Sequence, residues 1–331
     1  MTSHTSSSRP ARAQRCELAV PASNPKFFAK AAAADVDALF LDLEDAVAPQ
    51  QKEAARRQAI EALNGMDWGK KTVAVRINDL STPWALDDLL DIARQAPRLD
   101  LILLPKASSA FDVQFVDQIL TMVERQSGRD KRIGIEVLIE GAKGVANVEA
   151  IAQASPRLEA MIFGVGDYTV DMQTYDKVFG KPSARYAVPG APGADGATPM
   201  HWNDQWHFAL ARVANACRAW GLRPIDGPYT DFRDKDGYIA CAQRASALGF
   251  EGKWAIHPSQ IELANQVFSP TAQEVEWAQN TVRLLDETNR AGQGAVGHEG
   301  VLVDMAHLKL AQSIERRQAL IEAHRKVESS D

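Results

Sequence analysis

The segment TVAVRINDLSTPWALDDLLDIARQAPRLDLILLPK (Thr72–Lys106) carries the pattern that decides the fold. Two short apolar runs, Thr72–Ile77 and Leu101–Pro105, flank a stretch with apolar residues at helical spacing, Pro83–Arg94. Short apolar runs predict strands, and runs without polar alternation are typical of a parallel sheet that is covered on both faces. The segment therefore reads as one β-α-β unit.

The same unit recurs along the chain. Apolar runs predict eight strands, at Glu17–Val20, Ala38–Leu43, Thr72–Ile77, Leu101–Pro105, Ile133–Ile139, Ala160–Gly164, Arg223–Ile225 and Lys253–Ile256. Helices are predicted between them, at Pro25–Ala34, Gln51–Leu63, Pro83–Arg94, Ala110–Arg125, Gly144–Ala152, Asp204–Trp220 and Gly237–Leu248. Eight such units without a reversal favour an α/β fold, a (β/α)₈ TIM barrel, over a doubly wound sheet.

Two regions depart from this repeat. Between Asp167 and Asp204 there is no strong periodicity, and Pro189–Pro199 is dense in Pro, Gly and Ala, as in functional lids or disordered inserts. After the eighth strand the pattern predicts helices at Pro258–Phe268, Pro270–Ala291 and Met305–Val327, with a Gly-rich hinge or linker at Gly292–Gly300. We expect a disordered tail over residues 1–15, a barrel over 16–268 and a C-terminal helical lid over 269–331.

The composition excludes several classes of function. The 331 residues carry a formal net charge of −6, so a basic surface for nucleic acid or for an acidic membrane is not expected. Cys16, Cys217 and Cys241 form no CxxC pair, which argues against a zinc ribbon or a disulfide framework and fits a reducing compartment. No apolar run reaches the roughly 18 residues of a membrane-spanning helix. We expect a cytoplasmic protein that binds neither nucleic acid nor membrane.

Polar residues gather where the predicted strands end. They are Asp42, Glu44, Asp45, Arg76, Asn78, Lys106, Glu140, Asp167, Asp226 and His257. In a barrel the carboxyl ends of the strands form the face that carries the chemistry. Charges at the ends of apolar strands are costly unless they are paired or bound to metal. A ring of them at one mouth therefore predicts an active site.

Glu140 and Asp167 are the candidate metal ligands. They follow neighbouring strands, and carboxylates without Cys or His beside them suit a hard cation, Mg²⁺ or Mn²⁺. A helix N-cap for Asp167 and an ion pair for Glu140 explain the same residues without a metal.

Three further residues each have two interpretations. Arg76 could bind a carboxylate or an enolate-like oxygen of a substrate, or it could form a structural salt bridge with Asp45 or Glu44. Lys106 could form the Schiff base of a metal-free aldolase, but a salt bridge to the strand-end acids is the favoured interpretation. His257 could act as an acid or base in catalysis, but a role in orienting its loop is the favoured interpretation.

Together these strand ends resemble the citrate lyase β-subunit-like aldolase family, most closely its L-malyl-CoA/β-methylmalyl-CoA lyases. The family motifs are LDLEDAVAP (Leu41–Pro49) followed by Lys52, VRIN (Val75–Asn78), LLPK (Leu103–Lys106), EVLIE (Glu136–Glu140), FGVGDY (Phe163–Tyr168) and KWAIHPSQ (Lys253–Gln260). The subgroup is marked by RPIDGPYTDF (Arg223–Phe232), by the element around His201–His207 and by GVLVD (Gly300–Asp304). The resemblance covers roughly Arg15 to Ala319.

The resemblance implies a barrel with a C-terminal helical lid in homo-oligomers, trimers or hexamers. It implies Mg²⁺, or Mn²⁺, at Glu140 and Asp167, with Arg76 and Asp304 as catalytic residues. Substrate contacts would come from Lys30, which faces the CoA part, and from Arg76, Gly166, Asp167, Ile256 and His257. Asp304 would reach the site of a neighbouring subunit and move the proton at the α-carbon of the thioester.

Two departures from the family concern CoA. The family loop often reads Pro-Gly-Ser-Arg-Pro, whereas Pro21–Pro25 reads Pro-Ala-Ser-Asn-Pro, with Asn24 in place of arginine. A bulky aromatic of close relatives is Ala19 here. Lys26 is placed to substitute for the lost charge.

The implied reaction is cleavage or formation of a malyl-CoA-like thioester from acetyl-CoA or propionyl-CoA and glyoxylate. The alternatives are a citryl-CoA or citramalyl-CoA lyase, a malyl-CoA thioesterase, a carrier-dependent lyase subunit and a metal-free Schiff-base aldolase.

Overall fold

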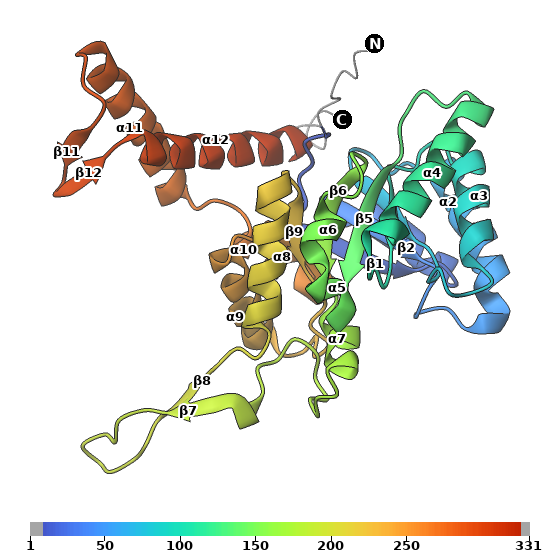
Figure 1. Cartoon of the computed structure of the whole chain (residues 1–331), viewed down its shortest axis with the longest axis horizontal. Helices are drawn as coiled ribbons and strands as arrows, with labels where there is room; N and C mark the ends of the chain where they lie inside the picture. The colour runs from blue at the N-terminus through green and yellow to red at the C-terminus, as the bar shows by residue number, and fades with distance from the viewer. Residues whose placement is uncertain (1–8, 326–331) are drawn as a thin grey trace. The chain divides into compact units, whose positions relative to one another are not determined.

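Eight parallel strands close into a barrel in the computed structural model, which describes residues 9–325 (Figure 1). They are β1 (Cys16–Pro21), β2 (Ala38–Asp42), β3 (Thr72–Arg76), β4 (Leu101–Leu104), β5 (Gly134–Ile139), β6 (Leu158–Phe163), β9 (Arg223–Asp226) and β10 (Gly252–Ala255). Each pairs with the next barrel strand along the chain, and β10 pairs with β1 to close the ring. The predicted (β/α)₈ barrel and its eight strands are confirmed.

Helices follow the strands around the outside of the barrel. They are α1 (Phe28–Ala32), α2 (Lys52–Gly65), α3 (Ala85–Gln95), α4 (Ala110–Ser127), α5 (Ala142–Ala146), α6 (Val148–Ala152), α7 (Val165–Asp171), α8 (His207–Trp220), α9 (Lys235–Ala247) and α10 (Ile261–Val267). Short 3₁₀ turns lie at Pro25–Phe27, Pro49–Gln51, Ala184–Tyr186 and Pro258–Gln260.

Helix α4 shows why these helices form where they do. A capping box between Ser109 and Asp112 satisfies backbone N–H groups at its start. The left-handed Gly128, with φ of 64°, ends it. Buried residues recur at a spacing of three or four from Val113 to Val123, so one face packs on the barrel.

Apolar side chains fill the barrel interior. Phe40, Leu101, Leu103, Leu138, Ile162, Ile225 and Trp254 belong to one buried cluster. Leu101 and Leu103 lie two residues apart on β4, so both side chains point to the same side of the sheet. The filled interior leaves only the ends of the barrel for polar groups.

A buried polar network lies near the amino ends of the strands. Gln14 donates hydrogen bonds to Glu17 and Glu136, at 3.1 and 2.9 Å. Arg223 forms ion pairs with Glu136 and Glu159, both at 3.4 Å. Burial, and then the charge of Glu136, raise the pKa of Glu17 well above its ordinary value.

Residues 9–15 of the predicted disordered tail contact the rest of the protein. Residues 1–8 of the predicted tail lie outside the described residues. Arg9 donates to the carbonyls of Leu158 and Trp220, and Arg15 is buried in an ion pair with Asp37 at 2.6 Å. These contacts correct the prediction of disorder for residues 9–15. A composition rich in Ser and Arg does not reveal such contacts.

The long connection between Asp167 and Asp204 contains structure that the sequence did not predict. It begins within α7 and continues into a hairpin of β7 (Ala187–Pro189) and β8 (Met200–Trp202). Helix α7 and the hairpin are too short to show a hydrophobic periodicity in a stretch that is rich in Pro, Gly and Ala.

Chain contacts divide the protein into two compact units, one spanning Gln14–Asn265 and one that begins at Gln266 and includes Ala11–Ala13. The second unit holds α11 (Ala272–Arg290), a hairpin of β11 (Val296–His298) and β12 (Val301–Val303), and α12 (Met305–Arg325). Helices α11 and α12 pack together (Figure 1). The Gly-rich stretch predicted as a hinge largely forms this hairpin. The last two residues of the predicted final helix lie outside the described part.

Candidate active site

A cavity of about 440 Å³ opens where the strands end. Its walls include Asp42, Arg76, Glu140, Gly166, Asp167, Ile256, Phe40, Phe179, Thr230 and Trp254. The structure therefore brings together Arg76, Glu140, Gly166, Asp167 and Ile256, which lie far apart in the sequence. Lys30, His257 and Asp304 do not line this cavity.

Arg76 is held by two carboxylates and two aromatic rings. Its Nε and Nη2 donate to the two oxygens of Asp42, both at 2.7 Å, and Nη1 lies 3.1 Å from Glu44 Oε2. The guanidinium carbon lies 5.6 Å from the Phe40 ring and 5.8 Å from the Trp254 ring. Burial lowers the pKa of Arg76, but Asp42 and Glu44 outweigh it, so the pKa lies above its ordinary value.

Asp42 is a site residue that sequence reasoning underrated. Its position on β2 is in register with Arg76 on β3, and this places the two side chains together. The salt bridge predicted for Arg76 exists, but Asp42 makes its bidentate part and Asp45 takes no part in it. The register of the two strands was the missing signal, because chain order alone pairs Arg76 equally well with each nearby acid.

Glu140 is a buried residue of the cavity wall. Its Oε1 accepts the backbone N–H of Lys106 at 2.7 Å. Burial, and then the negative charge of Asp167, raise the pKa of Glu140 to about 8. Asp167 Oδ2 is also buried and accepts no hydrogen bond from the described residues.

These two carboxylates fit a divalent cation. They are close enough for one charge to oppose ionisation of the other, and a cation between them would relieve that repulsion. Gly164 leaves the room this needs, because a Cβ there would lie 2.5 Å from Glu140 Oε2. Within residues 9–325 no group of three or more His, Cys, Asp or Glu could hold a metal ion. Water and substrate oxygens would complete the coordination, as is usual for Mg²⁺.

The alternative role of Asp167 as a helix cap is wrong. Helix α7 has Gly164 at its N-cap, and no side chain caps it. Asp167 lies in the first turn instead, where the helix dipole favours a negative charge.

Lys106 makes the salt bridges predicted for it. Its ammonium lies 2.6 Å from Glu44, 3.8 Å from Asp45 and 3.7 Å from Asp167. Burial lowers the pKa of Lys106, but the hydrogen bond to Glu44 and the nearby acids outweigh it, so the pKa is raised. A Schiff base requires a neutral amine, so this environment disfavours the aldolase alternative.

His257 serves its own loop. Its Nδ1 accepts the backbone N–H of Ser259 at 3.2 Å, and its ring stacks on Phe232 with centroids 4.5 Å apart. This geometry matches the loop-orienting interpretation. Its neighbour Ile256 is partly exposed and reaches the cavity wall.

Lys30 and Asp304 lie on other elements. Lys30 is exposed on α1, and Asn24 occupies the N-cap position of the short turn before that helix without a side-chain capping hydrogen bond. Asp304 precedes α12 in the C-terminal unit, where Oδ1 accepts the N–H of Ala306 at 3.0 Å and pairs with His307 at 2.9 Å. The hydrogen bond with His307 lowers the pKa of Asp304.

Phe179 is a cavity residue that the sequence did not reveal. Its N–H donates to Thr230 Oγ1 at 2.9 Å, which fixes the long connection beside the cavity. A Cβ on Gly166 would lie 3.3 Å from the Phe179 ring, so the glycine leaves room for the aromatic side chain. No periodic pattern marks Phe179, because it lies in the irregular connection.

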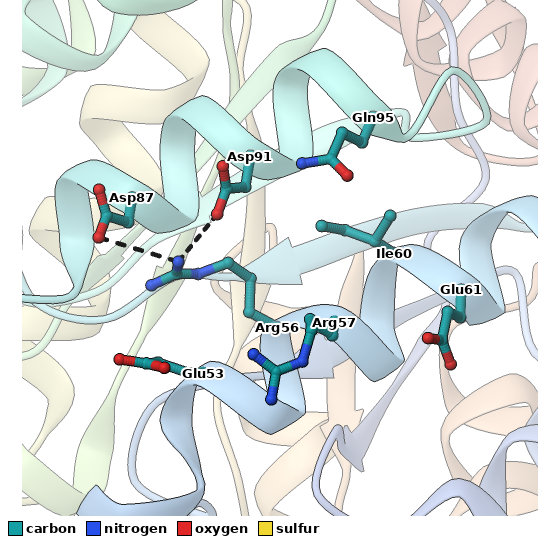
Figure 2. Close-up of a pocket in the computed structure, with 8 residues that line it drawn as sticks. All are labelled: Glu53, Arg56, Arg57, Ile60, Glu61, Asp87, Asp91 and Gln95. Atoms are coloured by element: carbon teal, nitrogen blue, oxygen red, sulfur yellow. Dashed lines mark hydrogen bonds and ion pairs between the residues drawn. The ribbon is translucent and has the colours of Figure 1, made fainter.

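A second hollow lies outside the barrel between α2 and α3. Figure 2 shows Arg56 directed towards Asp87 and Asp91, with Arg57, Glu53 and Glu61 nearby. Arg56 forms ion pairs with Asp87 and Asp91 at 3.9 and 2.9 Å, and none of the strand-end residues lines the hollow. We assign it no role in the chemistry.

Comparison with known proteins points to the same chemistry. The HpcH/HpaI aldolase/citrate lyase family model matches residues 15–258. The L-malyl-CoA/β-methylmalyl-CoA lyase of Cereibacter sphaeroides is 45% identical over 315 residues, which cover 95% of this chain and 97% of that protein. A malyl-CoA/β-methylmalyl-CoA/citramalyl-CoA lyase of Chloroflexus aurantiacus is 36% identical over 85% of this chain and 80% of its own.

A solved structure agrees with these relatives. Protein CitE from Mycobacterium tuberculosis, in complex with magnesium, acetoacetate and coenzyme A, is 30% identical and superposes with a TM-score of 0.69. The match covers 93% of this chain and 99% of that one. In residues 9–325 no helix is long and apolar enough to cross a membrane. The chain is therefore an enzyme, a lyase, and it belongs to the HpcH/HpaI aldolase/citrate lyase family.

Proposed function

We propose that this enzyme is a Mg²⁺-dependent carbon–carbon lyase for malyl-CoA-like thioesters. In the cleavage direction it would release glyoxylate and acetyl-CoA or propionyl-CoA, and in the other direction it would join them. The observation that carries the proposal is the arrangement of Glu140, Asp167 and Arg76 around one cavity. The high identity to malyl-CoA/β-methylmalyl-CoA lyases over nearly the whole chain supports the substrate class.

Glu140 and Asp167 would hold the cation, Mg²⁺ or Mn²⁺. When bound there, the cation supplies a Lewis acid that polarises the carbonyl of the oxo acid. The relief of repulsion between the two carboxylates and the unbonded oxygen of Asp167 support this assignment.

Arg76 would stabilise the enolate oxygen that forms when the carbon–carbon bond breaks. Hydrogen bonds to Asp42 use Nε and one N–H of Nη2, so other N–H groups of the fork remain for a ligand. Asp42 and Glu44 fix the orientation of the guanidinium before substrate arrives, and preorganised donors are effective at a developing charge.

The remaining assignments concern the two ends of the thioester. Gly166, Ile256 and His257 would contact the acid part, and the exposed Lys30 would contact the CoA part. Lys26, also exposed, is close to Lys30 in the chain and offers a second cation where Asn24 replaces the family arginine.

Asp304 would move the proton at the α-carbon of the thioester. Like any solvent-accessible aspartate it is ionised at neutral pH, as a general base requires, and its hydrogen bond with His307 orients the carboxylate. We propose that it acts in the site of a neighbouring copy, within a homo-oligomer of three or six chains.

A citramalyl-CoA lyase is the second candidate. The Chloroflexus relative, whose name includes citramalyl-CoA, gives this alternative its support. Citramalyl-CoA carries one more methyl group at the reacting carbon, so pocket shape decides between the two substrates.

A substrate panel tests the proposal. Purified protein is offered malyl-CoA, β-methylmalyl-CoA, citramalyl-CoA and citryl-CoA with and without Mg²⁺, and released oxo acid and free CoA are measured separately. We expect Mg²⁺-dependent glyoxylate release from the first two substrates. Free CoA without oxo acid would indicate a thioesterase, and pyruvate or oxaloacetate as the main product would favour the other lyases.

A further inference from the structure

Lys106 has an unusual backbone conformation at the edge of the site. Its φ is +52°, in the left-handed region that side chains other than glycine and asparagine rarely adopt. Within residues 9–325 the other non-glycine residues with positive φ are Gln173 and Glu299, which lie in a loop and a hairpin turn. Strain of this kind persists where the surrounding contacts impose it, and it concentrates at functional sites.

The strained conformation directs the backbone into the site. The N–H of Lys106 donates to Glu140 Oε1 at 2.7 Å. The next N–H, that of Ala107, donates to the carbonyl of Leu138 on β5 at 3.1 Å. The backbone after β4 is thus pinned to the strand that carries Glu140, and one oxygen of that carboxylate is fixed.

The side chain of Lys106 has a separate set of contacts. Its ammonium is anchored on Glu44 at 2.6 Å, and Glu44 also pairs with Arg76 at 3.1 Å. The same ammonium faces Asp167 Oδ2 at 3.7 Å, beyond hydrogen-bond distance. Its partner for the tight contact is therefore Glu44, while Asp167 keeps an oxygen free to bind something else.

We propose that Lys106 is a positioning residue with two tasks at the metal pair. Its backbone N–H orients Glu140, and its ammonium is a tethered counter-ion that competes with the divalent cation for Asp167. The inference rests on the proposed cation site and adds a residue that sets how tightly this site binds metal.

The ammonium of Lys106 affects cation binding through the sign of its charge and its distance from Asp167. A positive charge a few ångströms from a divalent cation weakens its binding, and partial burial makes the effect larger than in water. Before a cation binds, the same ammonium offsets the repulsion among Glu44, Asp45 and Asp167. Removing the charge while keeping the backbone should therefore tighten cation binding.

Lys106→Asn and Lys106→Gly remove the charge of the side chain while keeping the backbone conformation. Both residues tolerate positive φ and keep the N–H, and both remove the ammonium. Mn²⁺ binding to the purified protein at one fixed neutral pH is measured from the electron paramagnetic resonance signal of free Mn²⁺. We expect each variant to bind Mn²⁺ at least tenfold more tightly than the unsubstituted enzyme. A Kd within threefold of the original, or a weaker one, would overturn the counter-ion role.

Lys143→Asn is the matched control for charge. Lys143 is exposed and lines, together with Lys106, Glu140 and Asp167, a second cavity of about 350 Å³ beside the site. Within residues 9–325 it makes no hydrogen bond or ion pair with Glu140 or Asp167. Its Kd should stay within twofold of the original. An equal tightening in this variant would show that any nearby lysine suffices, which contradicts a specific role of Lys106.

Lys106→Ala tests the backbone task against Lys106→Gly. Both lack the ammonium, but alanine resists the left-handed conformation that aims the N–H at Glu140. We expect the alanine variant to bind Mn²⁺ several-fold more weakly than the glycine variant, and equal Kd values would overturn the orienting role.

If the original enzyme binds no Mn²⁺ at all, the proposed cation site fails as well. If it binds Mn²⁺ but the variants behave alike, only this inference fails.

Discussion

At the scale of single residues, the planar shape of the guanidinium determines which contacts Arg76 makes. Arg76 reaches both oxygens of Asp42 and one of Glu44 at once, and only a planar fork can do this. A lysine there would keep the charge but lose the fixed direction of the N–H groups.

We therefore expect Arg76→Lys to lower kcat by about 10²–10³-fold, the usual loss for one transition-state donor. KM for the thioester should change much less. Steady-state kinetics with malyl-CoA measure both, and a thermal melt checks that the variant folds. Arg57→Lys, in the exposed hollow of Figure 2, is the control and should be neutral. A kcat within twofold of the original would return Arg76 to a purely structural salt bridge.

Asp167 allows a second prediction at this scale. Because its Oδ2 accepts no hydrogen bond from the described residues, replacing the carboxylate by an amide removes the proposed metal ligand and, of the contacts at Oδ2, loses the 3.7 Å ion pair with Lys106. Asp167→Asn should raise the Mg²⁺ concentration needed for half-maximal rate by at least about tenfold, or abolish turnover, with the melting temperature little changed. Chelation should abolish the activity of the unsubstituted enzyme, and Mg²⁺ or Mn²⁺ should restore it. Full activity after metal removal would refute the metal assignment.

At the scale of the elements, the site depends on how closely neighbouring strands approach one another. Gly164 follows β6, and a Cβ there would lie 2.4 Å from Cβ of Glu140, which follows β5. Real side chains do not tolerate such a contact, so Glu140 would have to move.

Gly164→Ala should therefore reduce activity by more than about 10²-fold, since misplacement by about an ångström costs that much. It should weaken Mn²⁺ binding in parallel. Gly65→Ala is the matched control, because Gly65 ends α2 with nothing within 4 Å of an added Cβ. That variant should keep full activity and gain a little stability. Equal activity of the two variants would mean that the packing around Glu140 is less strict than the structure indicates.

The strands and the site differ in how far the sequence predicts them. Each barrel strand carries a short run rich in apolar residues, which is a local signal, and all eight are found within two residues of the prediction. The pairing of Arg76 with Asp42 depends on strand register, and the place of Phe179 depends on a hydrogen bond to Thr230, 51 residues away. Such long-range contacts leave no local pattern, so they were missed. Short elements such as α7 and the β7–β8 hairpin were missed because too few residues carry their period.

At the scale of the whole molecule, the buried network near the amino ends of the strands makes stability depend on pH. Burial and the charge of Glu136 raise the pKa of Glu17 above its ordinary 4.5. As the pH rises above 4.5, the unfolded chain loses this proton while the folded chain keeps it. The folded state then binds more protons, and the free energy of unfolding falls with rising pH until the folded pKa is reached.

Glu17→Gln should reduce this loss. The amide is neutral at every pH, and its oxygen can still accept the Trp254 N–H that lies 2.8 Å from the carboxylate. We expect the melting temperature of the unsubstituted protein to fall between pH 5 and pH 8 by at least about 2 °C more than that of the variant. Glu61→Gln, on the exposed face of α2, should follow the unsubstituted protein. Parallel melting curves for Glu17→Gln and the unsubstituted protein would contradict the prediction.

Asp304 belongs to the C-terminal unit and Arg76 to the barrel, and the proposal that they act in one site between copies makes a prediction about assembly. If Asp304 acts in the site of another copy, Asp304→Ala should retain thioester binding but lose turnover and exchange of the α-proton. Arg76→Ala should be inactive because the enolate is not stabilised. Oligomers refolded from both variants together should regain part of the activity, since some sites would combine an intact Arg76 with an intact Asp304. Mass spectrometry of the intact assemblies verifies the mixing. Mixed oligomers without recovered activity would exclude the arrangement between copies, and full turnover of Asp304→Ala alone would remove Asp304 from the chemistry.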